Sequence, residues 1–336
     1  MTFTTAAEIS ELQDQPRKIT ARPLIVDRIF FGGSRTVGAS VLVITGSIGI
    51  FLAFQAVPTL RRYGLKFFTG SQWYPERGHV GIASVLLGTF TIALVALAIA
   101  FPLALLSALY ISEYSPPRLR PLLVSLVDLM AAVPSIVYGL WVFFMVQPHA
   151  ANIERWLSAN LGWVPFFHVT GDPNAAISQT SNYYGSAFIA GIAVSMMVIP
   201  MACAVMREVF AKAPAGEREA AYALGSTRWG MVREVVLPFG RGGIIGGTML
   251  AMGRALGETI AVLLVIHPDF ALKFRPLEGG TISVASLIAG NYGDSTPSLL
   301  SALLAAGFIL FMITLVVNTL AAVVVNRSRS GAGTDI

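Results

Sequence analysis

The chain has 336 residues, of which 55% are hydrophobic and only 12% are charged, and its mean hydropathy is +0.70. A soluble globular protein carries about 25% charged residues, so this composition excludes a soluble fold and favours several membrane spans. The formal net charge is +5, but the basic residues flank the apolar segments and form no long stripe, which argues against a nucleic-acid partner. The single cysteine, Cys203, excludes a disulfide within the chain and is expected to be a small buried side chain.

The expected fold is that of an all-α polytopic membrane protein with six apolar segments, each near or above the roughly 20 residues that span a bilayer. The segments are Thr36–Val57, Gly81–Tyr110, Pro121–Val146, Tyr184–Met206, Gly242–Ile266 and Leu299–Val325. They define a transmembrane domain (36–325) between an N-terminal tail (1–35) and a short C-terminal tail (326–336). The first 20 residues contain three acidic side chains and no apolar run, so a cleavable signal peptide is not expected. A short interfacial helix is expected near Ile25–Phe31.

The distribution of Lys and Arg predicts the orientation of the spans. With the N-terminus inside, the cytoplasmic segments carry fifteen of these residues and the opposite side carries seven. Because cytoplasmic segments are enriched in Lys and Arg, both tails are expected on the cytoplasmic side of the membrane. The bias is not clean, since the first external connection contains four basic residues.

The third apolar segment contains the stretch DLMAAVPSIVYGLW, which runs from Asp128 to Trp141. Pro134 is expected to free a backbone carbonyl and kink the helix in mid-membrane, where Ser135 and Tyr138 offer hydroxyl donors to a transported solute. An equally supported alternative is that Pro134 serves only packing and that both hydroxyls bind backbone groups. Asp128 lies nearer the cytoplasmic end, where snorkelling or local pairing is expected.

The external connection, residues 147–183, is rich in aromatic side chains. They are Trp156, Trp163, Phe166 and Phe167, with Pro165 among them. The favoured interpretation is an interfacial helix or aromatic belt, and the alternative is a docking surface for an external protein.

The polar connection between the fourth and fifth segments, residues 207–241, carries the most specific pattern of the chain. Its fixed points are Glu219, Ala220 and Ala221, then Gly225, and finally Leu237 and Pro238. The two alanines let a helix approach another surface closely, and the glycine frees the backbone to turn between two short helices. The Leu-Pro pair is expected to stop the second helix. Apolar side chains on these helices suit a groove in another protein.

The fifth segment carries charges inside an apolar, glycine-rich stretch, in the motif GRALGET from Gly253 to Thr259. Arg254 lies about 12 residues after Gly242, roughly 18 Å along a helix, and is expected near mid-membrane with Glu258 one turn further on the same face. Charge at that depth indicates a functional site, and a guanidinium suits phosphate or another oxyanion. The alternative is an Arg254–Glu258 ion pair that only fixes helix packing.

The pattern E-A-A-x3-G-x9-hydrophobic-x-L-P resembles the coupling-helix motif of binding-protein-dependent ABC importer permeases, with Val235 where isoleucine is usual. Together with PSIVYGLW in the third segment and GRALGETIA in the fifth, it makes residues 81–325 similar to the C-type permease subunits of phosphate-specific ABC importers. The resemblance implies a type I importer permease whose loop seats in a cleft of an ATPase, and it places Arg254 and Glu258 on the transport path. With Ser135, Tyr138 and Thr259, these two residues form the expected substrate path.

The same resemblance implies three kinds of partner: a second permease subunit of similar fold, an ATPase dimer at the cytoplasmic face, and an external phosphate-binding protein. The sequence contains no G-x-x-x-x-G-K-[ST] phosphate loop, so ATP and Mg²⁺ are expected on the separate ATPase. No cofactor or metal is expected in this chain, because its four histidines are scattered without metal-ligand spacing.

Three alternatives stay open at this stage. The first is an importer permease for another oxyanion, namely sulfate, molybdate or phosphonate, since one arginine does not distinguish tetrahedral anions. The second is a stand-alone secondary transporter that uses Arg254 and Glu258 as a proton-coupled pair. The third is a membrane sensor that signals to a kinase.

Overall fold

The computed structural model describes residues 25–169 and 182–328. The predicted tail residues 1–24 and 329–336, and residues 170–181 of the predicted external connection, lie outside this description. The chain divides into two compact units, Met1–Ile50 and Phe51–Ile336. The first helix, α2 (Ile25–Tyr63), contributes to both units. It is continuous from Ile25, so the separate short helix expected near Ile25–Phe31 does not form.

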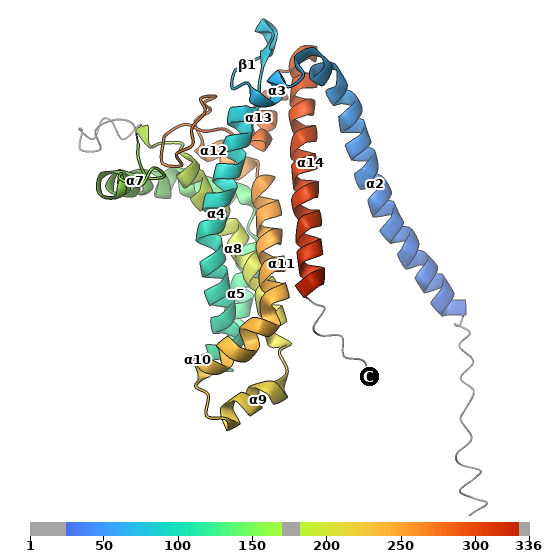
Figure 1. Ribbon diagram of the computed structural model, residues 1–336, viewed down its shortest axis with the longest axis vertical. Coiled ribbons are helices and arrows are strands. Elements are labelled where there is room, and N and C mark those ends of the chain that lie inside the picture. The colour runs from blue at the N-terminus through green and yellow to red at the C-terminus, as the bar shows by residue number, and fades with distance from the viewer. Residues whose placement is uncertain (1–24, 170–181, 329–336) are drawn as a thin grey trace, which may run out of the picture. The chain divides into compact units, whose positions relative to one another are not determined.

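Among the described residues of the unit that begins at Phe51, the regular structure is helical apart from one small hairpin (Figure 1). Its first half contains α3 (Lys66–Thr69), β1 (Trp73–Tyr74), β2 (His79–Val80), α4 (Ala83–Leu109), the π-helical segment η2 (Tyr110–Tyr114), α5 (Arg120–Ala132), α6 (Ser135–Trp141), the π-helical segment η3 (Val142–Val146) and α7 (Gln147–Leu161). The second half contains α8 (Ala187–Ala211), α9 (Ala215–Ala223), α10 (Arg228–Met231), the π-helical segment η5 (Val232–Val236), α11 (Leu237–Leu256), α12 (Ile260–Val265), α13 (Val284–Asn291) and α14 (Pro297–Ser328).

Six of the described helices are long and apolar enough to cross a membrane, which confirms the predicted all-α polytopic fold. They are Ile25–Tyr63, Ala83–Tyr114, Ser135–Leu161, Ala187–Ala211, Arg228–Leu256 and Pro297–Val325. All six differ in their bounds from the predicted spans, and the first starts at Ile25 instead of Thr36. Two of them are also organised differently. The predicted third span is split at Val133–Pro134, and the long helix starts only at Ser135. The helix in the predicted fifth span starts earlier, at Arg228, and ends at Leu256.

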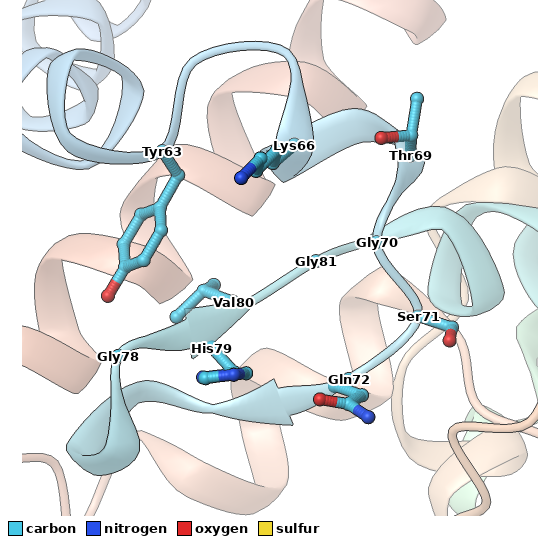
Figure 2. A pocket seen from close by; sticks show the side chains of 10 residues that line it. All are labelled: Tyr63, Lys66, Thr69, Gly70, Ser71, Gln72, Gly78, His79, Val80 and Gly81. Atoms are coloured by element: carbon cyan, nitrogen blue, oxygen red, sulfur yellow. The ribbon is translucent and has the colours of Figure 1, made fainter.

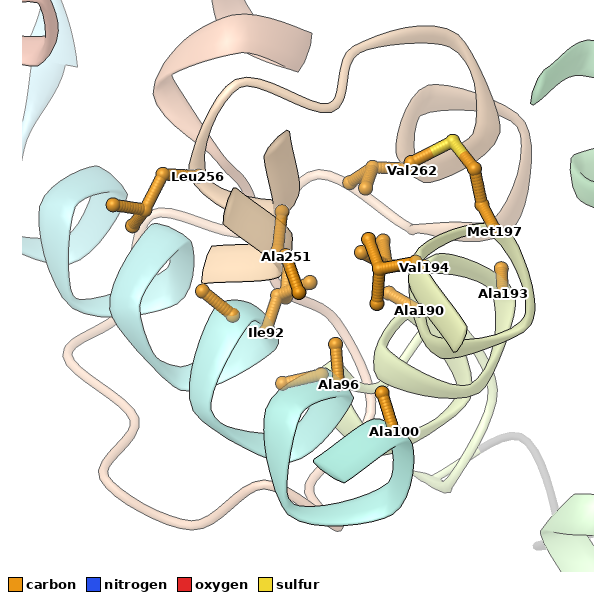
Figure 3. Close-up of a cluster of buried hydrophobic side chains, with 14 of the residues drawn as sticks. Ile92, Ala96, Ala100, Ala190, Ala193, Val194, Met197, Ala251, Leu256 and Val262 are labelled. Atoms are coloured by element: carbon orange, nitrogen blue, oxygen red, sulfur yellow. The ribbon is translucent and has the colours of Figure 1, made fainter. Parts of the chain in front are cut away.

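The core lies where α4, α8 and α11 meet (Figure 3). Ile92, Ala96 and Ala100 of α4 face Ala190 and Val194 of α8, and Ala251 and Leu256 of α11 close the cluster. Most of these side chains are small, so the helices approach each other closely. Membrane helices associate through such van der Waals packing, because no hydrophobic driving force acts between them. Gly243 of α11 lets this helix approach α8 closely, because an ideal Cβ there would lie 2.5 Å from the side chain of Val209.

The two ends of this bundle are built differently (Figure 1). We call the end that carries α9 and α10 the loop end, and the end that carries β1 and β2 the hairpin end. The hairpin is antiparallel, with Trp73 opposite Val80, and Gly78 turns the chain with φ 73°. Helix α7 runs across the direction of α4 in Figure 1, with Ala150 and Ala151 buried and Trp156 exposed. Helix α7 is the last part of the continuous helix Ser135–Leu161, so it is this amphipathic end of the helix that fits the interfacial helix favoured for the aromatic connection.

Candidate transport path and coupling loop

Two membrane helices are interrupted, and the interruptions lie on helices that touch. The first break separates α5 from α6 at Val133–Pro134, and Pro134 has an extended ψ of 141°. The second separates α11 from α12 at Gly257–Thr259. Helices α6 and α12 pack so closely that an ideal Cβ on Gly139 would lie 2.8 Å from Cα of Ala261. Irregular backbone at membrane depth is tolerated where it is buried in protein or lines a polar cavity, so this region is the candidate path.

Glu258 lies in the second break and not in a helix, which corrects the prediction that it shares a helical face with Arg254. The helix ends at Leu256, because Gly257 leaves the helical conformation. Glu258 is only 8% exposed, and its Oε1 accepts a hydrogen bond of 3.2 Å from the backbone N–H of Ala261. The carboxylate therefore satisfies one of the free N–H groups at the start of α12. The Thr259 hydroxyl donates to the carbonyl of Gly257 at 3.1 Å and supports the same turn.

Arg254 occupies the last turn of α11, and its side chain is exposed. Within residues 25–169 and 182–328, its guanidinium forms no hydrogen bond, ion pair or ring contact. The structure therefore does not form the Arg254–Glu258 ion pair that was the alternative explanation for these two charges. An unpaired guanidinium next to a helix break is free to bind an anion.

The hydroxyl groups of the first break behave differently from each other. The Tyr138 hydroxyl donates to the carbonyl of Met130 at 2.7 Å, bridging from α6 back to α5, and its side chain is buried. This matches the alternative in which a hydroxyl satisfies the backbone, so Tyr138 holds the break in shape. Ser135 is half-buried, and its hydroxyl makes no hydrogen bond to any described residue. Of the two, Ser135 is the group that remains available to a solute.

Asp128 pairs with a neighbouring helix, in agreement with the expected local pairing. Its Oδ1 lies 3.7 Å from Nη2 of Arg207 on α8.

The polar loop at the loop end contains one short helix, α9, and the predicted turn after it, but the second predicted short helix, α10, is the beginning of a longer helix. Helices α9 and α10 are joined at Gly225, whose φ of 84° lies in the left-handed region that glycine adopts without strain. Glu219 and Ala220 are exposed, and Ala221 is half-buried. Apolar side chains project into solvent beside them: Leu224 is 89% exposed and Trp229 is 56% exposed. Such exposed apolar groups on a short helix mark a protein-binding surface.

The predicted stop at Leu237 and Pro238 is wrong. Helix α10 runs through η5 into α11 without interruption, and Pro238 lies in the first turn of α11. Pro238 has no N–H to donate inside this continuous helix, and the π-helical turn before it absorbs the change in geometry. The loop helix and the membrane helix therefore form one continuous rod.

A buried carboxylate that the sequence interpretation missed fastens this loop to the end of α4. Glu113, in η2, has a side chain that is 3% exposed, and its two carboxylate oxygens lie 3.2 Å from Nη1 and Nη2 of Arg218 on α9. Arg218 also donates to the carbonyl of Phe210 at 2.6 Å, and Arg228 of α10 donates to the carbonyl of Glu113. The only sequence signal was an isolated acidic residue at the end of an apolar segment. We call Glu113, Arg218 and Arg228 the loop clamp.

Comparison with known proteins assigns this arrangement to a class. A solved bacterial ABC transporter involved in the import of the acidic polysaccharide alginate matches 89% of this chain and 99% of its own, with 17% sequence identity and a TM-score of 0.52. The fold is that of a type I ABC importer permease, a multi-pass membrane protein. Residues 100–330 match the family described as binding-protein-dependent transport system inner membrane component, and the chain belongs to that family.

Curated relatives agree over most of the chain. The phosphate transport system permease protein PstC 2 of Mycobacterium tuberculosis is 37% identical over 91% of this chain and 93% of its own. The phosphate transport system permease protein PstC of Xylella fastidiosa is 36% identical over 86% of this chain and 87% of its own.

Proposed function

We propose that this chain is the membrane-spanning permease subunit that conducts inorganic phosphate through an ATP-driven importer. The carrying observation is the free guanidinium of Arg254 next to the break between α11 and α12. A guanidinium presents planar N–H donors that match the oxygens of phosphate, and the two curated relatives described above are named phosphate transport system permeases.

The path residues divide the work of binding and release. Arg254 offers a positive site to the dianion, and Ser135 offers a hydroxyl donor across the α6–α12 contact. Glu258 holds the start of α12 through the N–H of Ala261, and its negative charge keeps phosphate from binding too tightly. Conduction requires a site that releases its ion as readily as it admits it.

The ATPase of the importer acts on this chain through the loop helices. Its dimer binds at the loop end, against the exposed Leu224 and Trp229, with Glu219, Ala220 and Ala221 at the contact and Gly225 at the turn. Closure of the ATPase moves α9 and α10, and the loop clamp carries that motion to α4. ATP and Mg²⁺ belong to the ATPase chain. In this proposal the loop end faces the cytoplasm, and the hairpin end faces the binding protein outside.

A second permease subunit of similar fold covers α5 and the Arg254 side of the path. Along α5, Leu122, Leu126 and Leu129 recur at helical spacing and are each about half exposed or more. An apolar stripe of this kind suits another membrane helix. The partner would also enclose Arg254, which the single chain leaves exposed.

Uptake of labelled phosphate in vesicles that contain this chain with the second permease subunit, the ATPase and the binding protein tests the proposal. ATP-dependent uptake that unlabelled phosphate suppresses, and sulfate or molybdate does not, is the expected result. Suppression by sulfate or molybdate would keep the importer and change its substrate. Uptake that needs no ATPase would overturn the importer role and favour a secondary transporter.

A further inference from the structure

A polar pocket of about 460 Å³ opens at the hairpin end, away from the two helix breaks. Figure 2 shows Tyr63 and Lys66 on one side of the opening and the strand residues His79 and Val80 on the other. The volume is within the range of small-molecule sites, which is about 300–1,000 Å³. The pocket involves none of the residues assigned to the transport path or the coupling loop.

The walls of this pocket are fixed by backbone hydrogen bonds and buried apolar anchors. Gly81 and Ile82 donate to the carbonyls of Gln72 and Phe67, both at 2.8 Å, so the hairpin is tied to α3. The anchoring side chain of Phe67 is fully buried. Gly70 and Gly81 pass so closely that a Cβ on Gly81 would lie 2.2 Å from the carbonyl carbon of Gly70. The site is therefore formed before any ligand arrives, which lowers the ordering cost of binding.

The chemistry of the lining is that of an anion receptor. Hydroxyl and amide donors come from Tyr63, Ser71 and Gln72, and the cation is Lys66. The Thr69 hydroxyl already donates to the carbonyl of Leu65 at 3.3 Å. Among the described residues that line the pocket, none is acidic.

The cations at this pocket are not neutralised by the protein. Neither Lys66 nor Arg62 forms an ion pair with any residue in the described part of the chain. Arg62 stands at the rim, where its Nη2 would be 3.8 Å from a Cβ on Gly78, and its guanidinium lies 5.4 Å from the centre of the Tyr63 ring. The nearby acidic residue, Glu76, lines a different pocket with Asn291. Two free cations beside neutral donors attract an oxyanion.

We propose that this pocket binds a phosphate group at the hairpin end, either as inorganic phosphate or as the phosphodiester of a lipid headgroup. The site is separate from the transport path and does not depend on the proposed transport of phosphate. Lys66 supplies the charge that a phosphate oxygen contacts, and the hydroxyl groups supply neutral donors. The volume exceeds that of one phosphate ion, which leaves room for bound water or for the glycerol of a headgroup.

The test uses the two permease subunits with the ATPase, without the phosphate-binding protein, in dodecyl maltoside, a detergent without phosphate. Arg254→Ala is the parent, so neither the binding protein nor the path arginine contributes. ³¹P NMR line broadening measures binding of inorganic phosphate and, in a second arm, of dihexanoyl phosphatidylglycerol. Removing a charged hydrogen-bond donor by Lys66→Ala is expected to weaken binding by about tenfold or more. Lys66→Arg is expected to keep most of it, and the exposed Lys212→Ala, at the loop end, serves as the matched control.

If Lys66→Ala weakens binding of inorganic phosphate and Lys212→Ala does not, the pocket is a site for the free ion. If Lys66→Ala weakens binding of the lipid only, the pocket is a headgroup site. Equal binding by the parent and Lys66→Ala with both probes would overturn the proposal, as would equal weakening by Lys212→Ala. Because Lys66 is exposed, its replacement leaves the packed core intact, and recovery of the assembled complex verifies this. Uptake of phosphate by the complex with native Arg254 is measured separately, so loss of this site does not bear on the proposed transport function.

Discussion

At the scale of single residues, Arg254 is the side chain on which the proposed transport depends most directly. Arg254→Ala is expected to reduce phosphate uptake at least tenfold, because a hydrogen bond to a charged group contributes roughly 1.5–3 kcal/mol. The complex should still assemble, since the guanidinium makes no hydrogen bond, ion pair or ring contact within the described chain that its loss would break. Vesicle uptake and co-purification with the partner subunits measure the two properties. Arg241→Ala, an exposed arginine on the same helix, is the control. Loss of assembly with Arg254→Ala would indicate a structural role.

Glu258 combines a helix cap with a negative charge, and two substitutions separate these roles. Glu258→Ala removes the acceptor for the N–H of Ala261 and is expected to destabilise the complex by about 1 kcal/mol, as other lost caps do. Glu258→Gln keeps a side-chain oxygen for this bond and is expected to retain stability while binding phosphate more tightly. Thermal unfolding of the complex and the concentration dependence of uptake report the two effects. Equal loss of stability in both variants would contradict the capping role.

At the scale of elements, the loop clamp is the connection that should matter most for coupling. Removing one partner of a buried ion pair costs roughly 3–5 kcal/mol, because the other charge stays buried and unpaired. Glu113→Ala is therefore expected to loosen α9 from α4 and to lower uptake per ATP hydrolysed. The ratio of uptake to hydrolysis in vesicles measures this. The charge exchange Glu113→Arg with Arg218→Glu should restore part of the ratio, and no restoration would mean that the pair is not what transmits motion.

The turn between α9 and α10 requires a residue at position 225 that can adopt a positive φ. Nothing lies within 4 Å of a Cβ at Gly225, but its positive φ costs a residue with a side chain roughly 1–2 kcal/mol. Gly225→Asp, which also adds a charge to the contact surface, is expected to weaken ATPase retention in membranes. Gly216→Ala is the matched control, since this glycine lies in α9 with equally open surroundings and a helical backbone. Full retention and coupling in Gly225→Asp would argue strongly against docking of an ATPase at this loop.

The elements that local chemistry determines could be predicted from the sequence. Pro134 marked a helix break, Gly225 marked a turn, and apolar length marked the six spans. The stop at Leu237–Pro238 was mispredicted, because a local π-helical turn can accommodate a proline without ending the helix. The break at Gly257–Thr259 contains no proline, and a lone glycine is tolerated inside helices. The local sequence therefore did not predict this break.

Contacts between segments far apart in the chain could not be predicted from the sequence, for a different reason. Glu113 and Arg218 are separated by 105 positions, and the local sequence around either residue does not indicate that the other is its partner. Arg254 was predicted as a path residue because charge is rare at membrane depth, and its place on the path stays a prediction. The clamp was missed because a carboxylate near the end of an apolar segment is ordinarily explained by solvation.

At the scale of the whole molecule, the orientation in the membrane decides which end meets the ATPase. The proposed orientation predicts that a cysteine at the exposed hairpin-end position Gln72 reacts with a membrane-impermeant maleimide in intact cells. A cysteine at Lys212, exposed at the loop end, should react only in inverted vesicles. Cys203 is fully buried and should stay unlabelled, so the native chain is the control. The reverse pattern would place the coupling loop outside, where no ATPase reaches it. The excess of Lys and Arg at the loop end and in the tails supports the stated orientation. The hairpin end is also basic, and in our proposal Arg62 and Lys66 are there because they hold an anion.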